Sequence, residues 1–257
     1  MSKDLALFAE ERPRRILEIL AKEGRLDVHA LAARMKVSLP TIRRDLTAME
    51  ADGRIVRVHG GVLHPKSVHG ESPLTLKRGE NVAAKRAMAA AAAALVPPGA
   101  AVFMDSGTTT LEVARALFPR RDVRIITNSV PLLAEALSAG VPVLCTGGEL
   151  RALSGALVGA PAELWISKLN VQVSFVGASG LDARGAWTTE TMEADTKTRI
   201  LAAGVTRILV ADASKWDVPH TVLFAGWERF HHWVCDKAPP AEECKKIEVA
   251  GCRVTAG

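Results

Sequence analysis

Three stretches within the first 62 residues place apolar side chains three and four positions apart, which is the spacing of one face of a helix. The pattern predicts helices over residues 10–22 and 28–35, and a third helix whose buried face carries Ile42, Leu46 and Met49. Glycine or turn residues interrupt the pattern between them, so the segment is predicted to form three short helices.

Capping residues mark where the second and third helices begin. Asp27 can cap the second helix, and Ser38 can cap the third, where Pro40 in the first turn needs no amide hydrogen. Beyond the third helix, charged and hydrophobic residues alternate over residues 54–58, as in a half-buried strand, and the strand ends at Gly60-Gly61. Three short helices and a β-hairpin predict a winged helix-turn-helix.

Beyond residue 80, apolar runs alternate with stretches of helical spacing. The apolar runs show little alternation with polar residues, which is typical of strands buried on both faces, and strands separated by helices predict a parallel sheet between helix layers. The expected strands are residues 100–104, 123–126, 141–144, 171–176 and 208–211. The expected helices are residues 82–95, 111–118, 131–138, 162–168 and 192–203.

Two domains fit the length of 257 residues. We predict an α/β protein with an N-terminal winged helix-turn-helix over residues 1–62 and a C-terminal Rossmann-like α/β domain with a mostly parallel sheet over residues 80–257. Residues 63–79 are interpreted as a linker, because Pro, Gly, Ser and His occur there without either period.

The positive charge of the chain lies almost entirely in the first quarter. Residues 1–66 contain 13 Lys and Arg against 9 Asp and Glu, and the remaining residues contain 20 against 19. This distribution is typical of a nucleic-acid-binding module attached to a nearly neutral domain. On charge alone, a solvated basic face is an equally good interpretation.

Other patterns exclude a membrane protein and a disulfide-rich one. The longest uncharged run, residues 87–104, is broken by two prolines and a glycine, so we expect no membrane span and no membrane partner. Acidic residues stand where a signal peptide needs an apolar core, which predicts a cytoplasmic protein. The four cysteines form no Cys-x-x-Cys pair, so we expect reduced thiols, no metal site and no cofactor.

The exposed face of the third helix is predicted to contact DNA. Arginine can pair with guanine in the major groove, which makes Arg43 and Arg44 the candidates for reading bases. Their alternative role is an ion pair with Asp45 or Glu50. Basic residues of the hairpin are better suited to phosphates. The residues expected at the DNA are Ser38, Thr41, Arg43, Arg44, Thr47, Arg54, Arg57 and His59.

Small and hydroxyl-bearing residues follow several of the expected strands. After the first strand, Asp105-Ser106-Gly107-Thr108-Thr109-Thr110 leads directly into a helix, and a helix N-terminus suits a phosphate. This turn is neither a dinucleotide fingerprint nor a P-loop, and an ordinary capped turn is an equal alternative. Later strand ends add Asn128, Ser129, Gly147, Gly148, Ser179 and Lys215. The carboxyl ends of parallel strands share one edge, so we expect these residues to line one crevice. Lys215 would supply a cation there, and the alternative for it is a surface lysine or a cap partner.

The chain resembles the DeoR family of bacterial sugar-metabolism regulators over most of its length. The N-terminal resemblance rests on Thr41-Ile42-Arg43-Arg44-Asp45-Leu46 followed by His59-Gly60-Gly61. The C-terminal resemblance includes the strand-end turns together with Arg78, Asn81, Lys85, Glu193, Lys197 and Cys235-Asp236.

This resemblance implies an effector domain that shares its fold with type A ribose-5-phosphate isomerase and binds phosphorylated sugars or related metabolites. It adds Arg78 and Lys85 to the residues expected at the effector. The chain departs from the family pattern at Cys235, where the family often has threonine, and in the Thr-Thr-Glu-Thr run ahead of Glu193, where it often has asparagine.

The function predicted is that of a DNA-binding regulator, a repressor of a carbohydrate operon, whose operator binding depends on a phosphorylated sugar. Its expected partners are an operator duplex, the sugar phosphate and further copies of itself in a dimer or tetramer. One alternative is a sugar-phosphate isomerase with an added DNA-binding domain. However, the Asp-Gly-Ala-Asp turn of that enzyme corresponds here to residues 176–179, Val-Gly-Ala-Ser, so both carboxylates are missing. We therefore expect no enzyme. A DNA-binding scaffold that has lost its ligand is a third interpretation.

Overall fold

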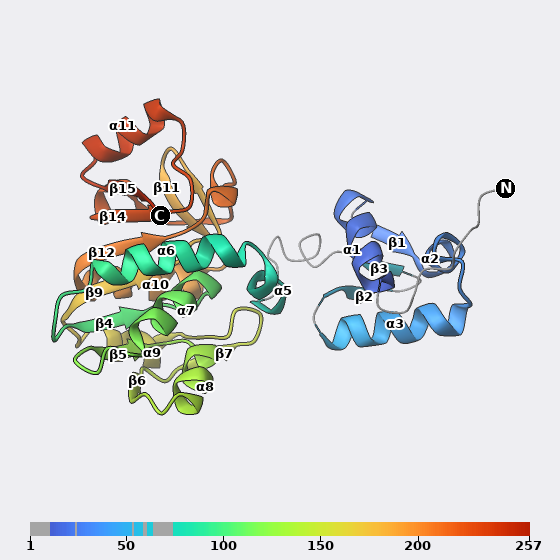
Figure 1. Cartoon of the computed structure of the whole chain (residues 1–257), viewed down its shortest axis with the longest axis horizontal. Coiled ribbons are helices and arrows are strands. Elements are labelled where there is room, and N and C mark those ends of the chain that lie inside the picture. Colours follow the sequence, from blue (N-terminus) through green and yellow to red (C-terminus); the bar gives the residue numbers. More distant parts are fainter. Residues whose placement is uncertain (1–10, 24, 53, 59–60, 64–73) are drawn as a thin grey trace. The chain divides into compact units, whose positions relative to one another are not determined.

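The computed structural model describes residues 11–23, 25–52, 54–58, 61–63 and 74–257 (Figure 1). The chain divides into two compact units, residues 1–79 and 80–257. Residues 74–79 of the expected linker form a short helix, α5 (Leu74–Gly79). His59 and residues 64–73 lie outside the described residues.

The first unit is the predicted winged helix-turn-helix. Its helices are α1 (Arg12–Glu23), α2 (Val28–Met35) and α3 (Leu39–Ala51). Its strands β1 (Arg25–Asp27), β2 (Val56–Val58) and β3 (Gly61–Leu63) form an antiparallel sheet in the order β1-β3-β2. Strand β1 was not predicted, and of its three residues only Asp27 had been given a role, as the cap of α2.

The predicted caps hold the helices of this unit in place. The Asp27 side chain accepts hydrogen bonds from the amides of His29 and Ala30, and the Ser38 hydroxyl accepts one from Thr41. Such a cap satisfies amides that have no partner within the helix. The core of the unit includes Ile16, Leu20, Leu31, Ile42 and Leu46, all fully buried.

The second unit contains a parallel sheet of seven strands in the order β15-β14-β12-β9-β4-β5-β6. These strands are β4 (Ala101–Met104), β5 (Arg124–Thr127), β6 (Val143–Cys145), β9 (Val171–Val176), β12 (Gly204–Val210), β14 (His232–Cys235) and β15 (Arg253–Ala256). The helices are α6 (Val82–Ala94), α7 (Thr108–Leu117), α8 (Val130–Ser138), α9 (Ala160–Ile166), α10 (Thr191–Ala203) and α11 (Ala241–Val249). The Rossmann-like α/β prediction is confirmed.

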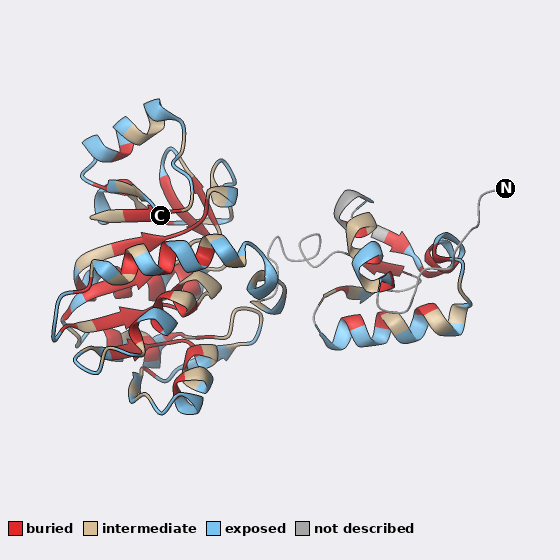
Figure 2. Cartoon of the chain, viewed as in Figure 1, coloured by how far each residue is buried: buried red, intermediate tan, exposed pale blue. Residues whose placement is uncertain are grey.

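Both faces of this sheet are buried, as Figure 2 shows for its central strands. Neighbouring residues of β4 belong to different apolar clusters: Phe103 packs in one with residues of α9, α10 and α11, and Met104 in the other with residues of α6, α7 and α8. Strands with apolar residues on both faces therefore lie between two helix layers, which is why their sequence shows no alternation.

Two smaller sheets and the last two strands of the main sheet were not predicted. A hairpin of β7 (Glu149–Arg151) and β8 (Ala156–Val158) follows β6. An antiparallel sheet joins β10 (Gly180–Asp182), β11 (Gly185–Thr188) and β13 (Val222–Gly226). These strands have only three to five residues, which is too short for a periodic pattern to mark them.

No described helix has both the length and the apolar character needed to cross a membrane. All four cysteines are free. Cys235 and Cys252 are fully buried beside the last two strands, and burial raises the pKa of both thiols to about 12. Thiols of this kind are held in the unreactive protonated form at neutral pH.

Candidate functional site

The recognition helix α3 buries one face and exposes the other. Arg43 and Arg44 are exposed, and within the described part of the chain neither forms an ion pair with Asp45 or Glu50. Asp45 instead accepts a hydrogen bond from Arg12, with 2.8 Å between Nε and Oδ2. The alternative role considered for these two arginines is therefore absent from the structure.

The contact between Arg12 and Asp45 joins α1 to α3. The two side chains are only 10% and 15% exposed, and the hydrogen bond to Asp45 raises the pKa of Arg12. A charged pair shielded in this way has a fixed geometry, so it helps to hold α1 against α3. Arg12 was not predicted, because nothing in a helix-starting arginine indicates a partner 33 residues away.

The wing is connected to α3 through Thr47. The Thr47 hydroxyl donates to the Arg43 carbonyl oxygen at 2.9 Å and accepts from the Arg57 guanidinium at 3.3 Å. Arg54 lies just before the wing strand, and its amide donates to the carbonyl oxygen of Met49. These contacts place two predicted phosphate-binding arginines beside the helix that carries the predicted base-reading ones.

In the second unit, the neighbouring strands β4 and β9 end at one buried ion pair. Asp105 directly follows β4, and its carboxylate pairs with the ammonium group of Lys197 from α10. The same carboxylate accepts from the amide of Gly177, which follows β9, and Lys197 also donates to the Gly177 carbonyl oxygen. Burial raises the pKa of the Asp105 carboxyl, and the positive charge of Lys197 opposes that rise.

This ion pair lies at the switch point of the sheet. From β4 the chain continues outward through β5 and β6 and then returns to β9 on the other side of β4. The connections after β4 and β9 therefore lead away from each other and leave a crevice between them, which is where open α/β sheets bind ligands.

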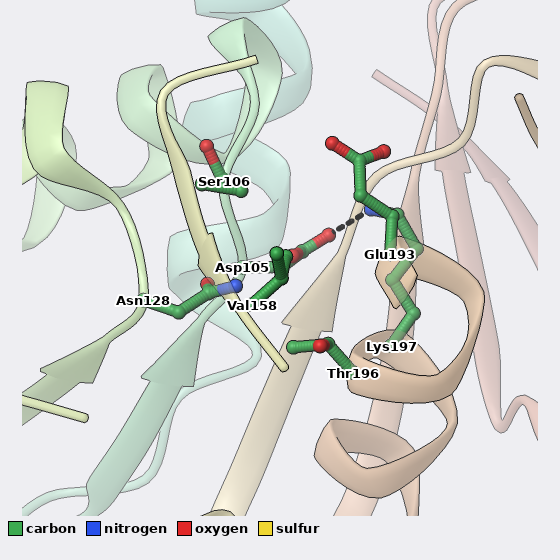
Figure 3. Close-up of a pocket in the computed structure, with 8 residues that line it drawn as sticks. Asp105, Ser106, Asn128, Val158, Glu193, Thr196 and Lys197 are labelled. Carbon is green, nitrogen blue, oxygen red and sulfur yellow. Dashed lines mark hydrogen bonds and ion pairs between the residues drawn. The ribbon is translucent and has the colours of Figure 1, made fainter. Parts of the chain in front are cut away.

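A small pocket opens beside the ion pair. Figure 3 shows Ser106 and Asn128 approaching it from one side and three residues of α10 from the other. Its lining consists of Asp105, Ser106, Asn128, Ala156, Val158, Glu193, Thr196 and Lys197. Ala156 and Val158 belong to β8, so the β7-β8 hairpin forms one wall.

Glu193 is held at the pocket by two side chains. Thr188 donates to its Oε2 at 3.0 Å, and Arg151 of β7 donates to its Oε1 at 3.2 Å. Glu193, Lys197, Thr196 and Arg151 were not assigned to the site from sequence. Glu193 and Lys197 stand out only as part of the family resemblance, and no local pattern indicates that α10 reaches the end of β4.

Three of the predicted effector residues line this pocket: Asp105, Ser106 and Asn128. The Ser106 hydroxyl donates to the Ser154 carbonyl oxygen of the hairpin at 2.9 Å, and the Asn128 amide nitrogen donates to the Leu157 carbonyl oxygen at 3.2 Å. The hairpin is thus fastened to the ends of β4 and β5.

Other predicted effector residues have internal roles. Ser129 caps α8, the Thr110 hydroxyl donates to backbone oxygens of its own turn, and the amide of Ser179 donates to Trp187. At Gly148 a side chain would meet the Val158 carbonyl oxygen at 2.7 Å, so close packing already explains this glycine. Neither Gly147 nor Gly148 lines the pocket described above.

The remaining predicted residues lie elsewhere along the chain. Thr108 and Thr109 form the N-terminus of α7, after Gly107, and their hydroxyls make no hydrogen bond with the described residues. Lys215 lies in a short 3₁₀-helix after β12. Lys85 is buried and donates to the Glu80 carbonyl oxygen, and burial lowers its pKa. Arg78 lies in α5, in the other unit.

Comparison with known proteins covers both units. Residues 12–68 match the DeoR-like helix-turn-helix domain, and residues 80–237 match the DeoR C terminal sensor domain. The chain is 36% identical to the HTH-type transcriptional regulator GlpR of Haloferax volcanii, covering 98% of this chain and 99% of the relative. It is 30% identical to the glycerol-3-phosphate regulon repressor of Escherichia coli K12, covering 80% and 82%. A solved ribose 5-phosphate isomerase A of Methanocaldococcus jannaschii is 16% identical over 53% of this chain and 55% of that chain, with a TM-score of 0.40.

A winged helix-turn-helix followed by an α/β sensor domain defines a DNA-binding transcriptional regulator. This chain belongs to the DeoR family, and the prediction made from the motifs of both parts is confirmed.

Proposed function

We propose that this regulator is a repressor that binds an operator through α3 and the wing and senses a phosphorylated sugar at the carboxyl edge of its parallel sheet. The residues proposed at the DNA are the predicted ones. Those proposed at the effector are Asp105, Ser106, Thr108, Thr109, Asn128, Lys85 and Lys215, with Lys197, Glu193 and Arg151 added. The proposed location is the cytoplasm, where the operator DNA is accessible.

The DNA-binding part is supported by the exposed arginines of α3. Arg43 and Arg44 have no ion pair within the described residues and protrude from a helix whose opposite face is buried. Guanidinium groups in this position can donate paired hydrogen bonds to guanine once the helix enters the major groove. Arg54 and Arg57 contribute phosphate contacts, which orient the module on the duplex.

The effector part rests on the N-terminus of α7 at the switch point of the sheet. Helix α7 starts at Thr108, just beyond the end of β4. Its unpaired first amides and the positive end of its dipole therefore lie at the edge of the sheet where the crevice opens. Two threonine hydroxyls that lack partners within the described residues add donors there. We include Lys85 and Lys215 as further cations of this site, and a phosphate accepts from all of these groups.

We propose sensing without turnover. Isomerisation needs a carboxylate that is available to move a proton between neighbouring carbons. The pocket carboxylates of Asp105 and Glu193 are each engaged by a cation, and Asp182 pairs with Arg184. A carboxylate held by a cation in this way is not free to accept a proton from a carbon of a bound sugar.

The DNA-bound form is proposed to be at least a dimer. One winged helix reads few base pairs, and selective binding in a genome needs more contacts than it supplies. Sedimentation of the full chain at micromolar concentration is expected to give a dimer or tetramer. A monomer alone under these conditions would contradict this part of the proposal.

A thermal-shift panel of phosphorylated sugars tests the effector site. We expect at least one to raise the melting temperature, because a ligand at 100 times its Kd stabilises the folded state by about 2.7 kcal/mol. Thr108→Ala and Lys215→Ala should each reduce this shift, whereas Ser138→Ala, which removes an exposed hydroxyl at the end of α8, should not. The stabilising sugar phosphate should be recovered unchanged after incubation. Its conversion to another sugar phosphate would favour the isomerase alternative.

A further inference from the structure

Charge at the pocket beneath the β7-β8 hairpin is balanced. Its two carboxylates, Asp105 and Glu193, are paired with Lys197 and Arg151, and all four side chains are largely shielded from solvent. A phosphate placed here would meet both carboxylates at close range, and an ammonium group would meet the cation of Lys197. The pairs thus favour a neutral ligand group over either kind of ion.

The same pocket is bordered by buried acceptors that lack donors. Asn128 is fully buried and lines the pocket; its amide nitrogen is fixed by Leu157, and its Oδ1 has no hydrogen-bond partner among the described residues. The Oγ of Ser154 is likewise buried without a partner in the described part of the chain. Ser154 is not itself part of the lining, but its carbonyl oxygen accepts from Ser106, which is.

Unpartnered buried oxygens of this kind are costly, and native proteins satisfy nearly all of them. Two in one place indicate that something else supplies the missing hydrogen bonds. A hydroxyl group meets both requirements of the pocket, since it is neutral and can donate to an amide or serine oxygen while also accepting.

We infer that this pocket is the subsite for the hydroxylated end of the effector, and that the effector binds with its phosphate directed away from Asp105 and Glu193. The ligand class is a polyol phosphate whose hydroxyls donate to Asn128, Ser154 and the two carboxylates. This orientation rests on the proposed function, because it assigns the phosphate to the N-terminus of α7.

Calorimetric titration of the full chain tests the orientation with paired probes. Glycerol 3-phosphate, ribose 5-phosphate and glucose 6-phosphate are compared with propyl, pentyl and hexyl phosphate, which have the same number of carbons but no hydroxyls beyond the phosphate. A site built to bond hydroxyls rejects analogues that lack them, so the tightest polyol phosphate should bind at least tenfold better than its alkyl partner.

Two variants locate the hydroxyl-binding end. Ser154→Ala removes an oxygen that makes no bond in the fold, so its folding should be intact, and it should reduce the preference for polyol over alkyl phosphate at least threefold. Asn128→Leu should reduce this preference further. Thr108→Ala should instead weaken both series alike, and Ser138→Ala should leave both unchanged.

Each outcome tests either the proposed orientation of the effector or the proposed function itself. Alkyl phosphates that bind as tightly as the polyol phosphates would overturn the orientation while leaving phosphate sensing in place. The orientation is also overturned if Ser154→Ala and Asn128→Leu both keep the full preference. Absence of binding by every probe and by inorganic phosphate at millimolar concentration would reject the proposed function itself.

Discussion

Replacing Lys197 with methionine is expected to lower the free energy of unfolding of the sensor domain by about 3–5 kcal/mol at neutral pH, because breaking one side of a buried pair leaves an uncompensated charge. The charge in question is the Asp105 carboxylate, whose side chain is 3% exposed. Urea unfolding followed by tryptophan fluorescence measures this domain alone, since all five tryptophans lie beyond residue 80.

The loss should depend on pH in a definite direction. Burial already raises the pKa of Asp105 above its ordinary value of 3.8, and removal of Lys197 removes the main opposing influence. A carboxyl whose pKa is higher in the folded than in the unfolded state makes its full contribution to the free energy of unfolding when the pH is below the unfolded pKa. This contribution is lost as the pH rises through the folded pKa. The Lys197→Met protein should therefore lose less stability at pH 5 than at pH 7.

A double replacement separates the pair from the packing around it. Asp105→Asn combined with Lys197→Met removes both charges of this pair, and it should recover a large part of what Lys197→Met loses, because neither charge of the pair is left buried without the other. Arg124→Ala, an exposed residue at the start of β5, serves as the surface control. A loss below about 1 kcal/mol in Lys197→Met, at the level of an exposed ion pair, would show that the pair is unimportant for the fold.

Replacing Arg44 with alanine is expected to weaken operator binding by about 1–3 kcal/mol, which is roughly 5- to 150-fold in Kd, and to relax the preference at one base pair. The physical reason is the loss of a guanidinium that donates two hydrogen bonds to one base. Fluorescence anisotropy with a duplex that contains the operator, and with single-base variants of that duplex, measures both effects.

The wing arginine provides the contrast. Arg57→Ala should weaken binding to all sequences alike and reduce the salt dependence, as expected for a phosphate contact. Arg124→Ala removes the same charge from the other unit and should change neither affinity nor preference. If Arg44→Ala bound every duplex as the unaltered chain does, α3 would not be the base-reading element.

Local signals in the sequence were enough for the first unit. The Asp27 and Ser38 caps, Pro40 in the first turn and the apolar stripe of α3 act within one or two helical turns, and the structure has helices at those places. The charge excess of residues 1–66 and the motif over residues 41–46 likewise depend on no distant contact. Function at the level of the family followed from these features.

The pocket depended on contacts that no local pattern encodes. Lys197 lies 92 residues beyond Asp105, Glu193 lies 42 beyond Arg151, and the unpredicted β7-β8 hairpin contributes one wall. Sequence spacing placed the polar turns after β4 and β5 at one edge of the sheet, because parallel strands end together. It could not show which residues of α10 reach that edge.

The sequence by itself therefore determined the two domain types, the helix that exposes Arg43 and Arg44, and the edge of the sheet where a ligand is expected, because periodicity, capping and charge are local properties. Only the tertiary structure decided that Arg12 pairs with Asp45, that Asp105 pairs with Lys197 and that the buried side-chain oxygens of Asn128 and Ser154 find no partner among the described residues. Those features arise when distant segments exclude water from charged and polar groups, which must then find partners in one another.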